Sequence, residues 1–192
     1  MTVLKSLFVA LIFGAVASVG VALHDHVHSE RWHVKTLSDG FKPEMKPIPS
    51  SVDEQSSFPD PQVSESVGRL RTERTVYAVD ANLIMVKKEL DGDYHLVLED
   101  PVTHSRLIAE IPDTNSEAPA CYRQAYAAAR AEIDGITGKP GFFSQIVGLK
   151  PTHPTRIRVT GIGFFDEIHL IPQAGVATNG REIHPVLAIE TD

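Results

Sequence analysis

The chain has 192 residues, enough for an ordinary domain with a leader and an arm, and 42% of them are hydrophobic, so a packed core can form. Its formal net charge of −7 argues against a general nucleic-acid binder, which normally carries a basic surface. Because Cys121 is the only cysteine, the chain cannot form an internal disulfide.

The first segment in chain order has the features of a secretory leader. Lys5 precedes residues 7–22, which are almost entirely apolar. We predict a signal peptide over residues 1–22, cleaved after Ala22, and export to the periplasm or out of the cell. Export without disulfides is ordinary for a bacterial envelope protein. The alternative is an uncleaved membrane anchor over the same residues, since the run is near the lower limit of the roughly 17–25 residues that span a bilayer.

Residues 23–68 predict an extended, Pro-rich arm rather than a separate domain. Near its start, His24, His26 and His28 alternate, so on an extended segment they would share one side and could chelate a divalent metal. The alternative for these histidines is a mobile terminal segment with no ligand. Residues 30–39, which include Trp32, predict a short strand or a segment that docks on the body of the protein.

The stretch from Thr75 to Ile111 predicts three antiparallel strands in a meander. Asp91-Gly92-Asp93 separates the first two alternating runs, and glycine tolerates the positive φ that a tight hairpin requires. On the first strand, alternation places one set of residues on the same face: Tyr77, Val79, Ala81, Leu83 and Met85.

A helix and two further strands follow the meander. The helix is indicated by residues that recur at helical spacing on one stripe, namely Tyr122, Ala125, Tyr126, Ala129 and Ile133. Gly135 is the predicted end of this helix. Residues 156–163 and 181–190 predict strands; Gly161 indicates a bulge or tight bend in the first, and Pro185 requires an edge position or a bulge in the second.

The order of three strands, a helix and two strands is the order of an OB-fold. We therefore predict a mainly β protein with an OB-fold-like, five-stranded barrel (β-β-β-α-β-β) over residues 69–192, preceded by the extended N-terminal arm. The alternative fold class is a small α+β sandwich.

The side chains that could carry chemistry occur as neighbouring carboxylates and histidines. A carboxylate beside a histidine can orient an imidazole as a general base, or supply oxygen and nitrogen ligands to a metal. The candidates for ligand or metal binding are Asp93, His95, Glu110, Asp166, His169, Glu182 and His184. The last four would form a small site at the barrel rim if the fold brings them together. The alternative is structural, with each pair holding a loop or a strand end in place.

Five segments of the chain resemble those of a family of uncharacterised exported bacterial proteins. They are ERWHVKTLSD, DGDYHLVLED, LIAEIPD, RIRVTGIGFFDEIH and GREIHPVLAIE, and they cover most of the chain after the leader. The resemblance implies that the mature chain is one unit, and that the candidate polar positions above are ones that recur in the family. It implies no catalytic role. The loop between His169 and Asn179 departs from the family pattern, which is richer in glycine.

The first functional hypothesis is a non-enzymatic, exported OB-like domain that binds a small ligand, an oligosaccharide or another envelope protein through its barrel face and long loops. The alternative is a secreted metal-dependent hydrolase or nuclease with a divalent metal as cofactor at the barrel rim. A third hypothesis, binding of single-stranded nucleic acid, is disfavoured by the acidic charge. Contact with a membrane is expected only through residues 1–22, if they are not cleaved.

Overall fold

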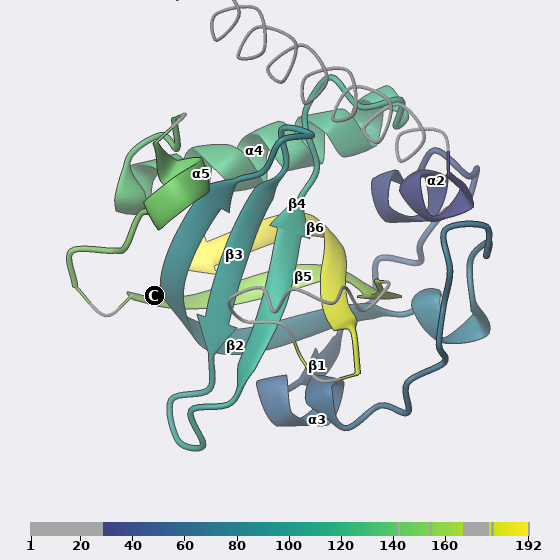
Figure 1. The fold of residues 1–192 in the computed structure, drawn as a ribbon, viewed down its shortest axis with the longest axis horizontal. Helices are drawn as coiled ribbons and strands as arrows, with labels where there is room; N and C mark the ends of the chain where they lie inside the picture. Colours follow the sequence, from purple (N-terminus) through teal and green to yellow (C-terminus); the bar gives the residue numbers. More distant parts are fainter. Residues whose placement is uncertain (1–28, 142, 154, 167–176, 178, 192) are drawn as a thin grey trace, which may run out of the picture.

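The computed structural model describes residues 29–141, 143–153, 155–166, 177 and 179–191. The predicted leader, the three N-terminal histidines and His169 lie outside these residues. In chain order the elements are α2 (Glu30–Thr36), β1 (Ile48–Ser50), α3 (Val52–Ser56), the 3₁₀ turn η1 (Arg71–Glu73), β2 (Val76–Lys88), β3 (Tyr94–Glu99), β4 (Arg106–Ile111), α4 (Ala120–Thr137), α5 (Ser144–Val147), β5 (Thr155–Phe165) and β6 (Arg181–Thr191) (Figure 1). Within the described ranges, no helix is both long enough and apolar enough to cross a bilayer.

Five strands close into a barrel, which confirms the predicted OB-like fold. They pair in the order β2-β3-β4-β6-β5, and β5 pairs back with β2. The long strand β2 makes this closure possible, because it pairs with β5 along its first half and with β3 along its second half. The β4–β6 pairing is parallel, whereas the other barrel pairings are antiparallel. The additional strand β1 pairs in parallel with β2, and α4 lies across one end of the barrel (Figure 1).

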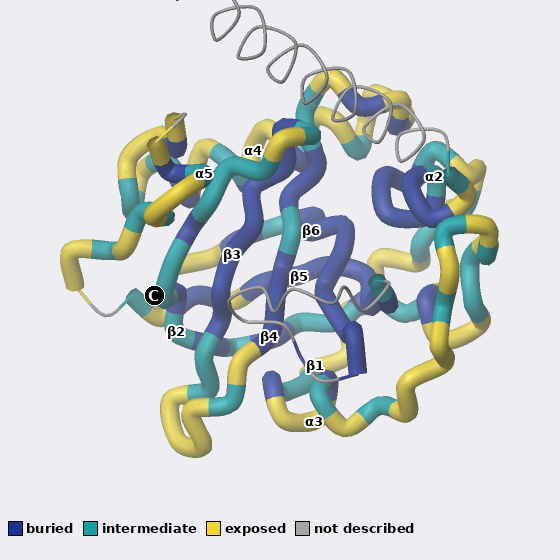
Figure 2. The backbone as a smooth tube through the Cα atoms, in the orientation of Figure 1, coloured by how far each residue is buried: buried dark blue, intermediate teal, exposed yellow. Residues whose placement is uncertain are grey.

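The barrel core is built from one face of each strand. Leu96 on β3, Ala109 on β4 and Ile183 on β6 are fully buried and belong to a single hydrophobic cluster. The predicted apolar stripe of α4 is confirmed, since Tyr126 and Ile133 are buried in the same cluster. Alternation therefore directs the intervening residues of β3, β4 and β6 to the outer face of the barrel. Figure 2 shows that these three strands are buried along most of their length, so their outer face is also covered.

Two bulges shape the barrel. In β2 the register shifts between Leu83 and Met85, so Val86 joins the core, and the prediction that Met85 shares a face with Leu83 is wrong. An inserted residue reverses the alternation beyond it. The second irregularity lies in the β5–β6 pairing around Gly161 and confirms the predicted bulge there. Pro185 falls within this irregular stretch, and β6 pairs on both sides, so of the two predicted alternatives the bulge is correct.

The N-terminal segment has more regular structure than predicted. Residues 30–36 form helix α2 rather than a short strand, because the Ser29 hydroxyl caps the helix by accepting the Trp32 N–H at 3.0 Å. The Pro-rich segment contains β1 and α3, and α3 begins with a capping box formed by Ser51 and Glu54. The sequence pattern Ser-x-x-Glu could have predicted this start. The domain boundaries at residues 22 and 68 stay predictions.

Two other element ends also differ from the predictions. Helix α4 does not end at Gly135 but continues to Thr137. The next residue, Gly138, caps the helix with a positive φ of 77°. Strand β5 extends to Phe165, so Phe164 and Phe165 belong to the barrel instead of the following loop.

A buried ion pair attaches α2 to the barrel. The Arg31 guanidinium donates to the Glu73 carboxylate at 3.0 Å, and also to the main-chain carbonyl of Phe165. The side chains of Arg31 and Glu73 are 1% and 0% exposed. Leu37, directly after the helix, is fully buried in the core cluster. Helix α2 is therefore an integral part of the domain.

The close approach of β5 to β6 requires glycine at position 161. A Cβ added to Gly161 would lie 2.5 Å from Ile183 Cγ2 and 2.6 Å from the Pro185 carbonyl oxygen. We expect Gly161→Ala to lower the free energy of unfolding by about 1–3 kcal/mol, the usual cost of overpacking a filled core. Urea denaturation followed by Trp32 fluorescence would measure this change.

The matched control is Gly135→Ala. Gly135 lies inside α4 with nothing within 4 Å of an added Cβ, so this substitution should stabilise the protein by up to about 1 kcal/mol. Equal effects of the two substitutions would contradict the assigned β5–β6 packing.

Candidate functional site

The β2–β3 hairpin positions the first site residue. Gly92 has a φ of 96°, as predicted for this turn, and the Glu89 N–H donates to the Asp93 carbonyl at 2.8 Å. Asp93 directly follows the turn and its side chain is fully buried. Its Oδ1 accepts the backbone N–H of Asp113 at 2.7 Å. One carboxylate oxygen is therefore held by the backbone, and Oδ2 remains to face the neighbouring strands.

Strand pairing places a row of three polar side chains across the outer face of β3, β4 and β6. His95 is the register partner of Glu110 on β4, and its Nδ1 lies 2.9 Å from Glu110 Oε1. The parallel β4–β6 register pairs Ile108 with Glu182, so two residues further along both strands Glu110 meets His184. The His184 Nδ1 atom lies 3.2 Å from Glu110 Oε2. Glu110 thus lies between two imidazoles from the adjacent strands.

The His184 ring is the centre of a cluster of carboxylates. Its Nε2 atom lies 3.5 Å from Asp93 Oδ2, and its Nδ1 atom lies 3.7 Å from Glu182 Oε2. The side chain of His184 is 1% exposed, and that of Glu110 is 12% exposed. Asp93, Glu110 and His184 each offer a donor atom, and the three atoms lie within 4.8 Å of one another.

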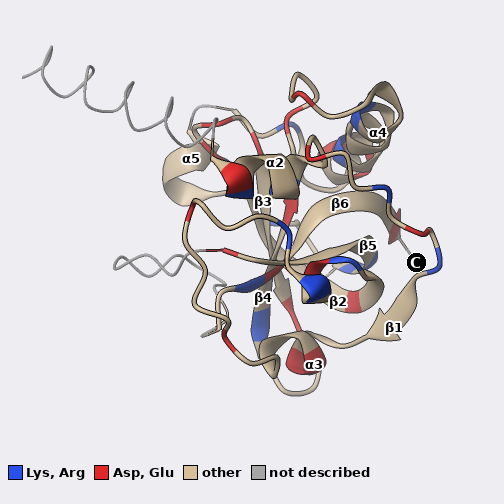
Figure 3. Ribbon diagram, turned by 90° about the vertical axis from the view of Figure 1, so that its right-hand side faces the viewer, with Lys and Arg blue, Asp and Glu red and all other residues tan. Residues whose placement is uncertain are grey.

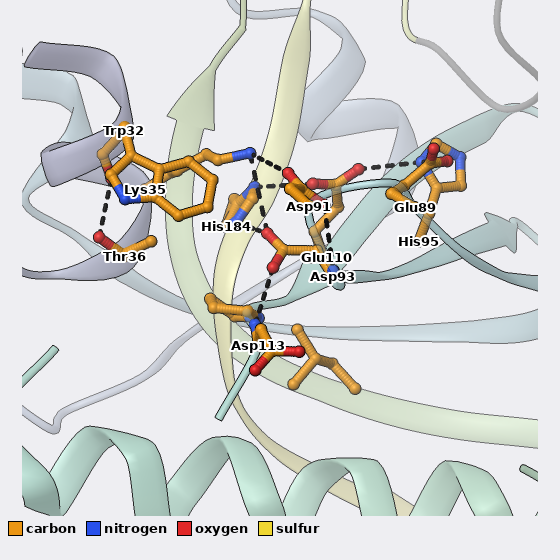
Figure 4. A network of polar contacts seen from close by, with 12 residues as sticks. Trp32, Lys35, Thr36, Glu89, Asp91, Asp93, His95, Glu110, Asp113 and His184 are labelled. Carbon is orange, nitrogen blue, oxygen red and sulfur yellow. Dashed lines mark hydrogen bonds and ion pairs between the residues drawn. The ribbon is translucent and has the colours of Figure 1, made fainter. Parts of the chain in front are cut away.

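Helix α2 adds a cation to the same cluster. The Lys35 Nζ atom lies 3.2 Å from Asp91 Oδ2 and 3.7 Å from Asp93 Oδ2 (Figure 4). The Lys35 side chain is 8% exposed and passes over the Trp32 ring, with Nζ 4.8 Å from the ring centroid. The hairpin, three strands and α2 therefore all contribute to one buried polar site, which we call the His184 cluster: Lys35, Asp91, Asp93, His95, Glu110, Glu182 and His184.

Several atoms at the centre of the His184 cluster lack hydrogen bonds. Asp93 Oδ2 and both ring nitrogens of His184 are buried and make no hydrogen bond, although carboxylates surround the ring at ion-pair distances. Distance alone does not make a hydrogen bond when the donor and acceptor are poorly aligned. Buried polar atoms are nearly always satisfied, whereas here the carboxylates offset the charge of the ring without aligned hydrogen bonds.

The charges within the cluster stabilise one another. Burial alone would lower the pKa of His184, but the nearby carboxylates of Asp93, Glu110 and Glu182 raise it well above its ordinary value. Burial opposes ionisation of Glu110, yet the two imidazoles and Lys35 hold its pKa well below the ordinary range. Burial and the negative charge of Glu110 together raise the pKa of Glu182 to about 7. Cationic Lys35 and His184 therefore offset the negative charge of Glu110.

The seven candidates predicted from the sequence are placed as follows. Asp93, His95, Glu110, Glu182 and His184 come together in the His184 cluster. Asp166 follows β5, where its N–H donates to the Gly180 carbonyl at 2.9 Å, and its charge contributes to the raised pKa of Lys35. Of the four residues predicted to form a site at the barrel rim, Glu182 and His184 therefore lie together in the His184 cluster. His169 lies outside the described residues.

Sequence reasoning missed Lys35 and Asp91. The expectation of a short strand or docking segment over residues 30–39 gives no direction for Lys35, whereas helix α2 turns this side chain towards the hairpin. The N-capping serine before an acidic first turn was the available signal. The sequence pattern places Asp91 in the hairpin turn, and in the structure its Oδ1 accepts the Asp93 N–H while its Oδ2 faces Lys35.

Comparisons with known proteins were made for the whole chain. No family model matches it, and no curated protein matches it. Among solved structures, the chain is similar to one described as an aspartyl-tRNA synthetase from Leishmania major Friedlin, with 12% sequence identity and a TM-score of 0.37. The similarity covers 78% of this chain and 21% of that protein, so the chain spans about a fifth of its length. The fold assignment rests on the strand order of this chain.

The position of Glu110 between two imidazoles makes its charge important for stability. We expect Glu110→Gln to lower the free energy of unfolding of the metal-free protein by about 3–5 kcal/mol, because it breaks a buried charge network and leaves the partners unpaired. Guanidinium denaturation, again followed by Trp32 fluorescence, would measure the loss.

Glu99→Gln is the matched control, since Glu99 also lies on a strand and pairs with His104 and Arg106, whose side chains are 73% and 50% exposed. Its loss should cost less than about 1 kcal/mol. If Glu110→Gln were as mild as this control, the cluster would not contribute to folding as described.

Proposed function

We propose that the chain is an exported, OB-like binding domain that holds a divalent transition-metal ion in the His184 cluster. The observation that carries the proposal is the convergence of Asp93, Glu110 and His184, whose donor atoms lie within 4.8 Å of one another. Export is proposed from the predicted leader, in which Lys5 precedes an apolar run.

The donor set fits such an ion. Zn²⁺ takes histidine nitrogen and carboxylate oxygen at about 2.0–2.2 Å, so two donors on one ion are separated by about 3–4 Å. An imidazole offers only one ring nitrogen to an ion, and one donor atom from each of Asp93, Glu110 and His184 lies within 4.8 Å of the other two, so these side chains would draw slightly closer around a bound ion. One imidazole with two carboxylates suits zinc, manganese or iron better than a soft ion such as Cu(I). His95, beside Glu110, would orient that ligand from outside.

A second buried charge pair in the same protein shows what a purely structural arrangement looks like here. Glu73, paired with Arg31, also accepts the Leu70 N–H at 2.8 Å and the Phe165 N–H at 2.9 Å. Both of its oxygens are therefore satisfied by protein groups. A buried atom without a hydrogen bond is not by itself unusual here, since Arg31 Nε also makes none. At the His184 cluster, however, the atoms without hydrogen bonds are a carboxylate oxygen and imidazole nitrogens, which are the donor types of metal sites, and this supports a bound ion there.

The location agrees with how OB-folds bind ligands. These folds use the face of their second and third strands together with the loops after the first and fourth strands. In this chain those parts are β3, β4, the hairpin that carries Asp91 and Asp93, and the segment that begins at Asp166. The His184 cluster lies on that face.

Nucleic acid is not the partner we propose for this face. Phosphate groups bind to lysine and arginine, whereas the described part of the face carries mainly carboxylates and histidines. Figure 3 shows that Lys and Arg positions are interleaved with Asp and Glu positions along the described chain.

The metal is tested with the mature chain in which His24, His26 and His28, the other candidate metal ligands, are replaced by alanine, after treatment with a chelator and dialysis. We expect Zn²⁺ or Mn²⁺ to bind at a single site per chain and to raise the melting temperature, because a ligand that binds only the folded state stabilises it. Elemental analysis and calorimetric titration would measure the stoichiometry and affinity.

His184→Ala should abolish this binding, whereas His104→Ala should leave it unchanged, because His104 is exposed and remote from the cluster. Circular dichroism would establish that both variants are folded. A wild-type protein that neither retains an added ion nor gains thermal stability from it would refute the proposal, whatever the variants do.

A metal-dependent hydrolase is the second candidate function. Catalytic zinc sites have three protein ligands and an open position for water, and Asp93, Glu110 and His184 would form a three-ligand site of this kind. Glu182, 6% exposed, lies beside His184 and could accept a proton from the bound water. The hydrolase predicts that the Zn²⁺- or Mn²⁺-loaded chain cleaves a generic phosphodiester or ester probe and that His184→Ala does not. A metal-loaded but inactive chain supports the binding function.

A further inference from the structure

Lys35 is held rigidly beside the proposed metal ligands. Its helix is fixed at both ends, by the Arg31–Glu73 ion pair and by the Tyr126 hydroxyl, which donates to the Thr36 carbonyl at 3.0 Å. The side chain of Lys35 is 8% exposed. An ammonium group so placed cannot leave the site by a simple rotation into solvent.

The Lys35 ammonium and an incoming ion would share an oxygen atom. Lys35 Nζ lies 3.7 Å from Asp93 Oδ2, the same atom that faces His184 Nε2 at 3.5 Å and makes no hydrogen bond. The other neighbour of Lys35 is Asp91, whose Oδ2 is 3.2 Å from Nζ. Asp91 is not among the three converging donors. The ammonium group therefore has a second carboxylate to pair with when Asp93 is occupied.

On the basis of the proposed metal site, we infer that Lys35 sets its affinity: the ammonium neutralises Asp93 in the metal-free protein and pairs with Asp91 alone when the ion binds. In the metal-free state Lys35 reduces repulsion between carboxylates that the fold brings together. In the metal-bound state it repels the ion. The consequence is a site that remains folded when empty and releases its ion readily, as in a protein that exchanges metal rather than one that needs metal to fold.

The magnitude of the effect follows from the charges. A divalent ion and an ammonium group a few ångströms apart repel each other enough to weaken binding about tenfold even at the dielectric constant of water, and more in a buried site. Removal of the Lys35 charge should therefore tighten metal binding while it destabilises the metal-free protein. If Lys35 acted only by packing, its replacement would weaken metal binding and destabilise the metal-free protein together.

The test compares Lys35→Met with Lys46→Met in the same mature chain, in which His24, His26 and His28 are replaced by alanine. Lys46 is the matched control because its side chain is 80% exposed and pairs only with the exposed Glu44 in the described structure, yet its loss changes the net charge by the same amount. We expect Lys35→Met to bind Zn²⁺ about tenfold or more tightly than wild type, in competition with a chromogenic chelator, and to melt at a lower temperature without metal. Lys46→Met should match wild type in both measurements.

A double-mutant cycle with Asp91→Asn separates two effects of Asp91: its pairing with Lys35 and the direct attraction of its charge for the metal ion. In wild type, Asp91→Asn removes the alternative partner of Lys35, so Zn²⁺ binding should weaken. In the Lys35→Met background the same change should have a smaller effect. Should Lys35→Met not fold, Lys35→Gln, which keeps hydrogen-bond donors towards Asp91 without the charge, replaces it.

The outcomes are distinguishable. If wild type and all variants fail to bind Zn²⁺, the proposed metal function itself is wrong. If wild type binds Zn²⁺ but the Lys35 variants bind it equally or more weakly, the metal site stands and the inference about Lys35 is overturned.

Discussion

The parallel pairing of β4 with β6 is the contact on which both the barrel and the site depend. It connects the end of the meander to the last strand, so the five strands can close. The same register places Glu110 next to His184 on the outer face while Ala109 and Ile183 face the core. A shift by one residue would exchange the two faces and put the charged side chains inside the barrel. The hydrophobic core and the polar site are therefore specified by one register.

The buried charges of this domain are of two kinds. The Arg31–Glu73 pair joins α2 to the barrel, and the backbone groups around it satisfy the Glu73 carboxylate. The His184 cluster is buried to a similar degree but leaves donor and acceptor atoms without hydrogen bonds. Well-packed apolar side chains can replace a buried ion pair at little or no cost in stability. Stability alone therefore does not account for the His184 cluster, whereas the proposed metal ion would.

The N-terminal arm connects these two kinds of buried charge. Helix α2 supplies Arg31 to the structural pair and Lys35 to the cluster, four residues later on the same short helix. Residues separated by four positions lie on the same side of a helix, so docking α2 through Arg31 also directs Lys35 at the carboxylates. In this way helix α2, which lies outside the barrel strands, becomes part of the site. Its docking over the carboxylates also explains why the site is buried.

Features that depend on neighbouring residues can be predicted from the amino-acid sequence. Alternation, the glycine of the Asp91-Gly92-Asp93 hairpin, the α4 stripe and the bulge at Gly161 follow from backbone and side-chain preferences within a few positions, and together they predict the OB-like order of elements. The row formed by His95, Glu110 and His184 depends on the fold, because strand register and the β4–β6 pairing join positions far apart in the chain. The formation of helix α2 and its direction towards the site also depend on the fold: a seven-residue helix is too short to be stable alone, so packing and its Ser29 cap, rather than a long periodic pattern, hold it in place.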